Sequence, residues 1–525
     1  MCDNIKVKIM QKGKFFMKKF KKWLSLTLAA IMLLSVAAVF IGCGETSDDP
    51  AGESGQSTVT NAEDENGDVD NRFVGVNYDG RPFRVYTTTA DYDDGAGNSN
   101  FLIEGTSKTE GNMVNDAVLE RNITVEELLG VKLEFTQTDI SYDGVPADIR
   151  ILTQSGLDEF DLVINSIFSF SELLIEGHFR NVLDESCVFD FDRNYWYRDY
   201  MEDLRLMNGY QYILAGDYFI DVMRTAHLLL LNKELYKDYN NRSADEVYDI
   251  VSNYEWTFDK LNEICSNIYV DLNTNNEVDK GDQFGFMTAS AWGGAIPFMI
   301  SGNPTYISRD EDGIPTISIH EGDRANLMAN AMSAIFNNES ASVALTEGPD
   351  LLLAFTQNEA LVLGYQRLGS LENTVLRSME GDAAVLPYPM LFASDKKYTS
   401  STHDTTSMGA ILTTSTDMEF ISTVTEVLCR ETANILMPKY YKESLQVQCV
   451  DDEKAAAMID IIHDNFGQSF ILAYNGSLGS TILQSFTTAI QEKREFSAVF
   501  AGQATRSNKN LTNKIRQFVK KNQIS

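Results

Sequence analysis

An acidic loop at residues 271–282 of the 525-residue chain has side chains spaced to bind a metal ion. Oxygen-bearing side chains stand at the first, third, fifth, ninth and twelfth places of this window, and the seventh would offer a backbone carbonyl. This spacing is typical of a calcium loop, because calcium takes about six to eight hard oxygens around one point. The predicted ligands are Asp271, Asn273, Asn275, Glu277, Asp279 and Asp282.

Two residues depart from the ideal loop. Asn276 stands where glycine normally makes the sharp turn, although asparagine tolerates left-handed backbone. Asp282 replaces the longer, bidentate glutamate. We therefore expect weak calcium binding with a structural role, suited to the calcium concentration outside cells. An acidic, solvated turn without metal is the alternative.

Catalytic motifs are missing from the rest of the sequence. It has no nucleophile elbow, zinc-protease helix, dinucleotide fingerprint or phosphate-binding loop. The five histidines are scattered and have no paired spacing. We therefore expect no enzymatic activity. A glycosidase stays open as an alternative, because a chain so rich in acids forms many chance carboxylate pairs.

The charge balance excludes one class of partner. The chain has 43 basic and 76 acidic residues, a net charge of −33. Residues 1–42 hold eight Lys and one Asp, or +7, so the remainder sums to −33 − 7 = −40. Such a body repels phosphate backbones, and we expect no nucleic-acid partner. The hydrophobic content of 43% is that of a folded globule.

The N-terminus predicts export. Lysines at 18, 19, 21 and 22 precede an uncharged run, 23–42, that ends at Cys43; Met17 is an alternative start. The segment 40–43 resembles a bacterial lipobox, which implies a signal peptide over 1–42 and a lipid on Cys43. An uncleaved membrane anchor is the alternative. Residues 43–72 then predict a disordered acidic tether, since they hold few large apolar side chains.

The elements that would position a site alternate along the chain. Strand patterns at 83–87, 131–136 and 160–164 enclose helical patterns at 113–129 and 149–153, an order that predicts a parallel sheet. A second α/β region follows. Its predicted elements are strands at 210–215 and 226–231, and helices at 257–269, 416–428 and 451–466. Two lobes with an interlobe ligand cleft and a helical C-terminal part fit this order.

The order of several segments resembles that of bacterial extracellular solute-binding lipoproteins of ATP-driven (ABC) importers, especially the large Gram-positive sugar-binding type. The carrying segments are 118–135, 158–164, 209–217, 230–236, 256–286 and 386–389. The resemblance implies a two-lobed, type II-like periplasmic-binding-protein fold. Lobe one would be 73–225 plus 381–432 and lobe two 226–380 plus 433–525, with the first crossing near Thr225. It also implies a monomer at the extracellular face of the cytoplasmic membrane, with the permease subunits as partners.

Sugar binding would use aromatic rings and polar planar groups, because sugars stack on rings through their C–H faces. Trp292 lies in a glycine-flanked loop, Asp217 at a strand end, and Trp196 in an aromatic run. Tyr365 and Arg367 follow an apolar strand. These five are the predicted ligand contacts. A hydrolase and a surface adhesin or sensor subunit remain the alternative functions.

Overall fold

The computed structural model describes residues 71–88, 100–105, 113–141, 143–289, 293–343, 349–372, 374–446 and 453–524. These residues belong to one compact unit, Asn61–Ser525. The predicted signal peptide, Cys43, nearly all of the tether and Trp292 lie outside the described residues. No described helix is both long and apolar enough to cross a membrane.

The first sheet confirms the predicted β-α-β-α-β order. Its strand order is β2-β1-β3-β13-β4, with β1 parallel to both β2 and β3. The late strand β13 enters antiparallel between β3 and β4. The strands are β1 (Arg81–Thr88), β2 (Val131–Thr138), β3 (Leu162–Ser166), β4 (Ile213–Leu214) and β13 (Ser407–Ala410).

The second sheet is mixed and deeply buried. Its order is β10-β7-β11-β5-β12, with β6 paired to β7 outside this path. The four leucines 228–231 of β5 are completely buried, as their unbroken apolar run predicts. The strands are β5 (His227–Asn232), β6 (Tyr269–Val270), β7 (Gln283–Thr288), β10 (Ala341–Val343), β11 (Ala360–Arg367) and β12 (Ala383–Leu386). A separate hairpin pairs β8 (Ile307–Arg309) with β9 (Pro315–Ile317).

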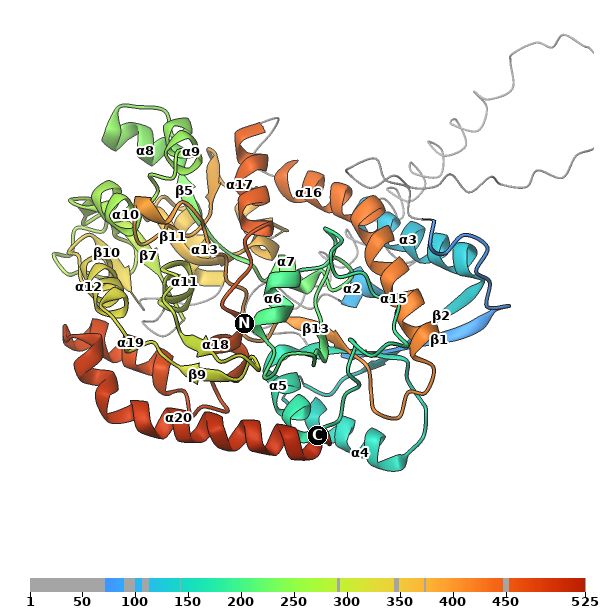
Figure 1. The fold of residues 1–525 in the computed structure, drawn as a ribbon. Coiled ribbons are helices and arrows are strands. Elements are labelled where there is room, and N and C mark those ends of the chain that lie inside the picture. The colour runs from blue at the N-terminus through green and yellow to red at the C-terminus, as the bar shows by residue number, and fades with distance from the viewer. Residues whose placement is uncertain are drawn as a thin grey trace, which may run out of the picture. The chain divides into compact units, whose positions relative to one another are not determined.

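Helices cover both sheets and make up most of the C-terminal third (Figure 1). Up to the end of β7 they are α2 (Asn100–Ile103), α3 (Met113–Leu129), α4 (Val145–Ser155), α5 (Ile167–Glu176), α6 (Arg198–Asp203), α7 (Asp221–Arg224), α8 (Lys233–Asn240), α9 (Asp245–Ser252) and α10 (Phe258–Cys265). After β7 they are α11 (Ile296–Ser301), α12 (Arg324–Phe336), α13 (Pro349–Thr356), η2 (Leu368–Glu372), α14 (Thr374–Arg377), η3 (Ala393–Asp395), α15 (Met418–Glu431), η4 (Thr432–Leu436), α16 (Met437–Gln446), α17 (Glu453–His463), α18 (Ser469–Tyr474), α19 (Thr481–Glu492) and α20 (Phe496–Lys521).

The chain passes between the sheets more than once. The first passage lies between β4 and β5 and includes the predicted crossing at Thr225. The return comes between β12 and β13, later than the predicted boundary at residue 381, because β12 pairs with β5 of the second sheet. Beyond it, α15 packs on α3, α17 packs on β12, and α20 contacts both α5 and α19. The fold is therefore mixed α/β with a helical C-terminal part, as predicted.

Candidate functional site

A bulge in β11 places Tyr365 in an unusual backbone conformation. The pairing of β11 with β5 shifts register between Leu363 and Gln366. Tyr365 lies inside that irregularity with a φ of 56°, and its backbone N–H donates to the Tyr388 hydroxyl at 2.7 Å. A left-handed tyrosine is costly unless its surroundings hold it, and such residues gather at functional sites. The bulge re-aims the Tyr365 side chain.

Polar and aromatic groups from distant segments surround the Tyr365 ring. The His227 ring stacks on it with centroids 5.6 Å apart, and the Tyr365 hydroxyl lies 3.3 Å from His403 Nε2. The Arg367 guanidinium carbon is 5.7 Å from the ring centroid. A Cβ on Gly293 would come within 3.0 Å of Tyr365 Cζ, so this glycine permits the close approach. Tyr365, His227, His403, Arg367 and the nearby Thr288 are called the Tyr365 cluster below.

The two histidines of the Tyr365 cluster are neutral at pH 7. Burial lowers the pKa of His403 to about 4, and burial, with His403 and Arg367 nearby, lowers the pKa of His227 well below 6.5. His227 Nδ1 lies 2.9 Å from the Ser401 hydroxyl, which leaves Nε2 buried without a hydrogen-bond partner among the described residues. The buried Thr288 hydroxyl likewise has no partner there. A buried polar atom without a partner carries a desolvation penalty that a ligand could relieve.

The place of the Tyr365 cluster in the fold favours a ligand site. Thr288 ends β7 and Arg367 ends β11, two neighbouring parallel strands. Ligands of open α/β sheets bind outside the carboxyl ends of such strands. His403 comes from the passage between β12 and β13. The cluster thus combines neutral hydrogen-bonding side chains, a buried cation and a ring, which suits a polar solute.

The predicted ligand residues fall into separate places. Tyr365 and Arg367 lie together, as their spacing along one strand implies. Trp292 lies outside the described residues; its neighbour Gly293 lies so close to the Tyr365 ring that a Cβ there would come within 3.0 Å of Tyr365 Cζ. Asp217 and Trp196 belong to other polar groups. The sequence pattern indicates no partner for His227 or His403. The two histidines come together only in the folded chain, because one lies in the second sheet and the other in the crossing segment.

Asp217 accepts hydrogen bonds in a buried group beside the same crossing segment. Its Oδ1 accepts a hydrogen bond from the Tyr197 hydroxyl at 2.8 Å and lies 3.5 Å from His463 Nε2. Burial opposes protonation of His463, but Asp217 and then Asp464 outweigh it and raise the His463 pKa to about 10. Asp217 therefore pairs with a charged histidine from α17, and this pairing joins a loop after β4 to a helix that packs on β12. A ligand role for Asp217 stays a prediction.

The His463 pairing predicts a pH-dependent stability. A histidine whose folded pKa lies above its unfolded value of about 6.5 stabilises the fold fully below that value. The contribution is lost as the pH rises through the window up to about 10. We expect His463→Gln to lower the free energy of unfolding by about 3 kcal/mol at pH 6, discounted because the Nε2–Oδ1 distance is long. Urea unfolding of both proteins across pH 6–10 measures this difference.

The difference between wild type and His463→Gln should shrink steadily from pH 6 and be small at pH 10, where about half of the His463 side chains in the folded state have lost their proton. His320→Gln is the matched control, because His320 is exposed. A His463→Gln effect that stays constant from pH 6 to pH 10 would show that the charged pair does not stabilise the fold.

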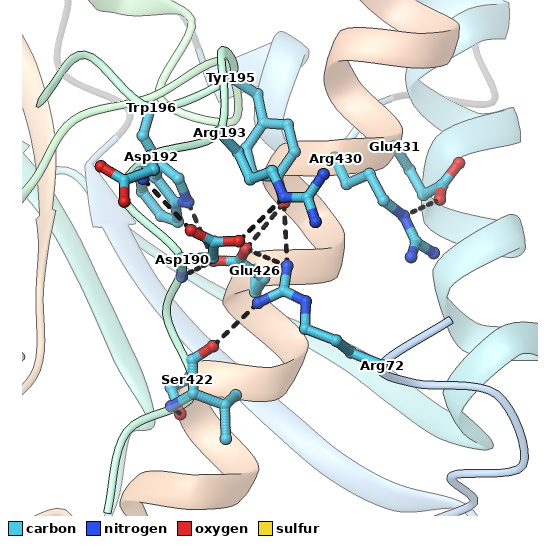
Figure 2. Close-up of polar contacts among 11 residues, drawn as sticks. Arg72, Asp190, Asp192, Arg193, Tyr195, Trp196, Ser422, Glu426, Arg430 and Glu431 are labelled. Atoms are coloured by element: carbon cyan, nitrogen blue, oxygen red, sulfur yellow. Dashed lines mark hydrogen bonds and ion pairs between the residues drawn. The ribbon is translucent and has the colours of Figure 1, made fainter. Parts of the chain in front are cut away.

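Trp196 lies in a buried polar group centred on Glu426 (Figure 2). The carboxylate of Glu426 accepts hydrogen bonds from Trp196 Nε1 at 2.9 Å, the Tyr195 hydroxyl at 2.7 Å and Arg72 at 2.7 Å. The Trp196 ring packs edge-on against Phe189. The indole N–H of Trp196 already donates its hydrogen bond to Glu426. The structure therefore adds no support for the predicted ligand role of Trp196. The same group also fixes Arg72, which we had placed in the tether, so the folded region includes residues 71 and 72.

The acidic loop 271–282 holds its predicted ligands in one hydrogen-bonded web. Asp271 accepts from the backbone N–H groups of Asn275 and Asn276, and the side-chain amide of Asn273 donates to Asp279 at 2.8 Å. Asn276 has a φ of 60°, the left-handed conformation that glycine usually supplies. Asp282 is completely buried. Its Oδ2 accepts from Tyr269, whereas Oδ1 has no hydrogen-bond partner among the described residues.

The oxygen-only donor set and the buried, unpartnered Asp282 Oδ1 fit calcium. Among the described residues, however, no group of three or more His, Cys, Asp or Glu side chains lies close enough to hold a metal. Both asparagine amides, Asn273 and Asn275, turn their NH₂ groups toward Asp279. Calcium binding would require those amides to present oxygen instead, with Glu277 adding its carbonyl.

A pocket of about 450 Å³ lies away from all the predicted site residues. It is bounded by α8, the loop into α9, and Gly381–Asp382. Its charged lining includes both Lys233 and Glu234, so neither sign of charge dominates. The predicted interlobe cleft remains a prediction.

Comparison with known proteins gives a likeness of fold. No protein-family model matches the chain, and no curated protein matches it. The crystal structure of an uncharacterized protein from Listeria monocytogenes aligns with a TM-score of 0.53 at 11% identity, covering 82% of this chain and 100% of that one. The two chains share a fold.

Two further solved structures align with TM-scores just below 0.5. The GacH receptor of Streptomyces glaucescens, crystallised without ligand and with acarbose, has a TM-score of 0.49 at 10% identity, covering 82% of this chain and 99% of its own. A solute-binding protein of an ABC transporter from Thermotoga lettingae, bound with α-D-tagatose, has a TM-score of 0.48 at 12% identity, covering 82% and 100%.

Proposed function

We propose that this chain is the extracellular solute-binding receptor of an ABC importer. It captures a sugar or oligosaccharide at the Tyr365 cluster, closes its lobes around it and delivers it to the permease. The observation that carries the proposal is the pair of buried, unpartnered polar atoms, His227 Nε2 and Thr288 Oγ1, at the strand ends where the chain passes between the sheets. The sequence resemblance to sugar-binding lipoproteins supports the same function.

The chemistry of the Tyr365 cluster suits hydroxyl groups. A neutral histidine donates through one ring nitrogen and accepts through the other, and a sugar hydroxyl does both. His227 and His403 stay neutral because burial lowers the pKa of each. Arg367 adds donors for a ring or hydroxyl oxygen, and the Tyr365 ring offers an apolar edge for C–H groups. Together they bind a polar, uncharged solute better than an ion.

The same cluster argues against glycoside hydrolysis. Hydrolysis of this kind uses two carboxyl groups on opposite sides of the bond. Among the described residues, Asp404 is the one carboxylate in ion-pair range of the two histidines, at 3.1 Å from His403 Nδ1. With neutral histidines and one carboxylate within ion-pair range of them, the cluster offers hydrogen bonds suited to holding a solute.

Calorimetric titration of the full chain, purified in detergent, with a panel of mono- and oligosaccharides tests the proposed function. The receptor predicts one saturable, one-to-one isotherm in the micromolar range or tighter, with the sugar recovered unchanged by chromatography. Cleaved sugar would establish a hydrolase. Binding only to an insoluble polysaccharide would establish an adhesin.

The proposed location follows from the N-terminal segment. We infer that Cys43 carries the lipid, that the tether leads to the folded unit, and that the protein acts as a monomer on the extracellular face. Arg72 is the point where the tether joins the fold, because Glu426 holds it at 2.7 Å. This arrangement keeps a loaded receptor close to its permease.

We also infer that the loop 271–282 binds calcium as a structural ion. Calcium at ten times a millimolar dissociation constant would stabilise the fold by about 1.4 kcal/mol and raise the melting temperature by about 2 °C. We expect this shift in the wild type. Asp271→Ala should abolish it, because that substitution removes the first ligand. Differential scanning fluorimetry at 0 and 10 mM calcium measures it.

Asp312→Ala is the matched control for the calcium test. Asp312 is exposed in the turn of the β8–β9 hairpin, so its loss changes the charge equally without touching the loop. The control should keep the full shift. Wild-type protein that melts at the same temperature with and without calcium would mean that the loop is a solvated turn.

A further inference from the structure

The C-terminal helix α20 carries only basic charges, all within residues 506–521, although the protein is strongly acidic. This 26-residue helix contains no acidic residue, whereas the chain as a whole has a net charge of −33. Its bases are Arg506, Lys509, Lys514, Arg516, Lys520 and Lys521. If acidic residues were spread evenly along the chain, a 26-residue surface helix would contain several of them. The charge of α20 therefore differs from that of the rest of the protein.

Four of these bases form one stripe along the helix. At 100° per residue, Arg506, Lys509, Arg516 and Lys520 fall within an arc of about 80°. All four side chains are exposed. The buried residues of α20 lie on the opposite face: Phe496, Phe500, Ser507, Leu511, Ile515 and Phe518. From Arg506 to Lys520 the stripe runs about 21 Å, at 1.5 Å per residue.

The described part of the chain does not neutralise the stripe. Among the described residues, no carboxylate lies within ion-pair distance of any of its four bases. Exposed lysines on other elements do have acidic partners, such as Lys132 with Glu126 at 2.8 Å and Lys454 with Asp249 at 2.6 Å. Although the chain has 76 acids, the described residues place none within ion-pair distance of this row of bases.

The rest of the fold presents the stripe rigidly. The Ser507 hydroxyl lies 2.5 Å from that of Thr481 on α19, and Asn508 accepts from the Ile317 backbone N–H at 2.9 Å. Near the C-terminal end, Asn522 donates to the Leu174 carbonyl on α5 at 3.1 Å. In Figure 1, α20 runs along the margin of the described unit, with α19 and α5 on its inner side. The bases therefore stand in a fixed, nearly straight row.

We propose that the outer face of α20 docks on an anionic lipid surface. Several bases in one fixed row bind the negative headgroups of a bilayer together, and a lipid chain plus a basic patch anchors more firmly than either alone. The remaining surface is acidic and is repelled by the same bilayer, so this attraction also sets the orientation of the protein. A flat surface fits best, because the four bases are long, exposed side chains in one straight row along a helix. The docking is independent of the solute site.

Lysine reactivity on vesicles tests the docking. The full chain, reconstituted by its own N-terminal segment into vesicles, is treated briefly with an acetylating reagent and mapped by mass spectrometry. With 30% phosphatidylglycerol, Lys509 and Lys520 should react at least five-fold more slowly than in pure phosphatidylcholine. The exposed Lys237 and Lys397 should react equally in both vesicles, and 0.5 M salt should remove the difference.

Charge reversal supplies the matched comparison. Arg506→Glu together with Arg516→Glu should abolish the lipid-dependent protection, read at Lys509 and Lys520. A second double variant, Lys132→Glu with Lys454→Glu, changes the net charge by the same amount elsewhere and should keep the protection. Equal reactivity of the wild-type stripe on neutral and anionic vesicles would overturn the proposal. So would protection by soluble polyphosphate but not by anionic vesicles. Sugar titrations would be unaffected by either result, so the receptor function stands or falls separately.

Discussion

Tyr365→Ala combined with His403→Ala is expected to weaken sugar binding about 100-fold or more. The change removes the ring and two hydrogen-bonding groups that face each other at 3.3 Å, and each such contact contributes about 1 kcal/mol or more. A loss of about 2.7 kcal/mol corresponds to a factor of 100 in the dissociation constant. Titration calorimetry with the sugar that binds wild type measures the loss.

The control for this pair is Tyr254→Ala with His178→Ala, which removes the same residue types elsewhere. Tyr254 is 39% exposed, and His178 pairs with Glu176 on the side of the first sheet. The control should bind sugar like wild type. If the Tyr365 and His403 variant keeps a native circular dichroism spectrum and binds the sugar unchanged, the Tyr365 cluster is not the binding site.

Glu426→Leu is expected to destabilise the fold by about 3 kcal/mol. The substitution leaves the Tyr195 hydroxyl and the Trp196 indole N–H without their acceptor, and each orphaned buried donor costs about 1–3 kcal/mol. Arg72 adds less, because its side chain is 31% exposed and regains water. Urea unfolding measures the change.

Glu426→Gln serves as the milder comparison, because it keeps an acceptor of the same shape. We expect less than half the effect of Glu426→Leu. Equal destabilisation by both would mean that the charge, rather than the satisfied donors, carries the stability.

Arg72→Met is expected to change how the free energy of unfolding depends on pH, through the Glu426 carboxylate. Burial raises the pKa of Glu426 above its usual value, and Arg72 opposes that rise. Without Arg72 the folded-state pKa rises further, so ionised Glu426 destabilises the fold as the pH climbs through that window. Arg72→Met should therefore cost more stability at pH 7 than at pH 5. A larger cost at pH 5 would contradict this account.

Local patterns predicted most of the fold. The alternation of strands and helices up to residue 166 and the buried leucines of β5 follow directly from hydrophobic spacing. The short strand β13 escaped prediction because Ser407–Ala410 carries no strand signal and gains its partners from β3 and β4. Helix α15 begins at Met418, two residues after the predicted start at residue 416, because Asp417 caps it by accepting a hydrogen bond from the Phe420 N–H.

The site was less predictable for a physical reason. Tyr365 and Arg367 were predicted together because they follow an apolar run, and their ligand role stays a prediction, whereas His403 comes from a crossing segment with no pattern of its own. Asp217 was predicted at a strand end that could face a cleft, and Trp196 in an aromatic run that fitted either the core or a ligand contact. Both are buried, because His463 and Glu426, more than 200 positions further along the chain, hold their polar atoms. Such partners depend on tertiary packing, which no local sequence window contains.

Hydrogen exchange with and without the bound sugar tests the central claim most directly. The full chain is exchanged in deuterated buffer at saturating sugar and mapped by proteolysis. The account predicts slower exchange in the peptides that contain residues 364–367 and 401–406, with no change in the loop 271–282. Protection confined to the pocket between α8 and α9, with none around Tyr365, would contradict it.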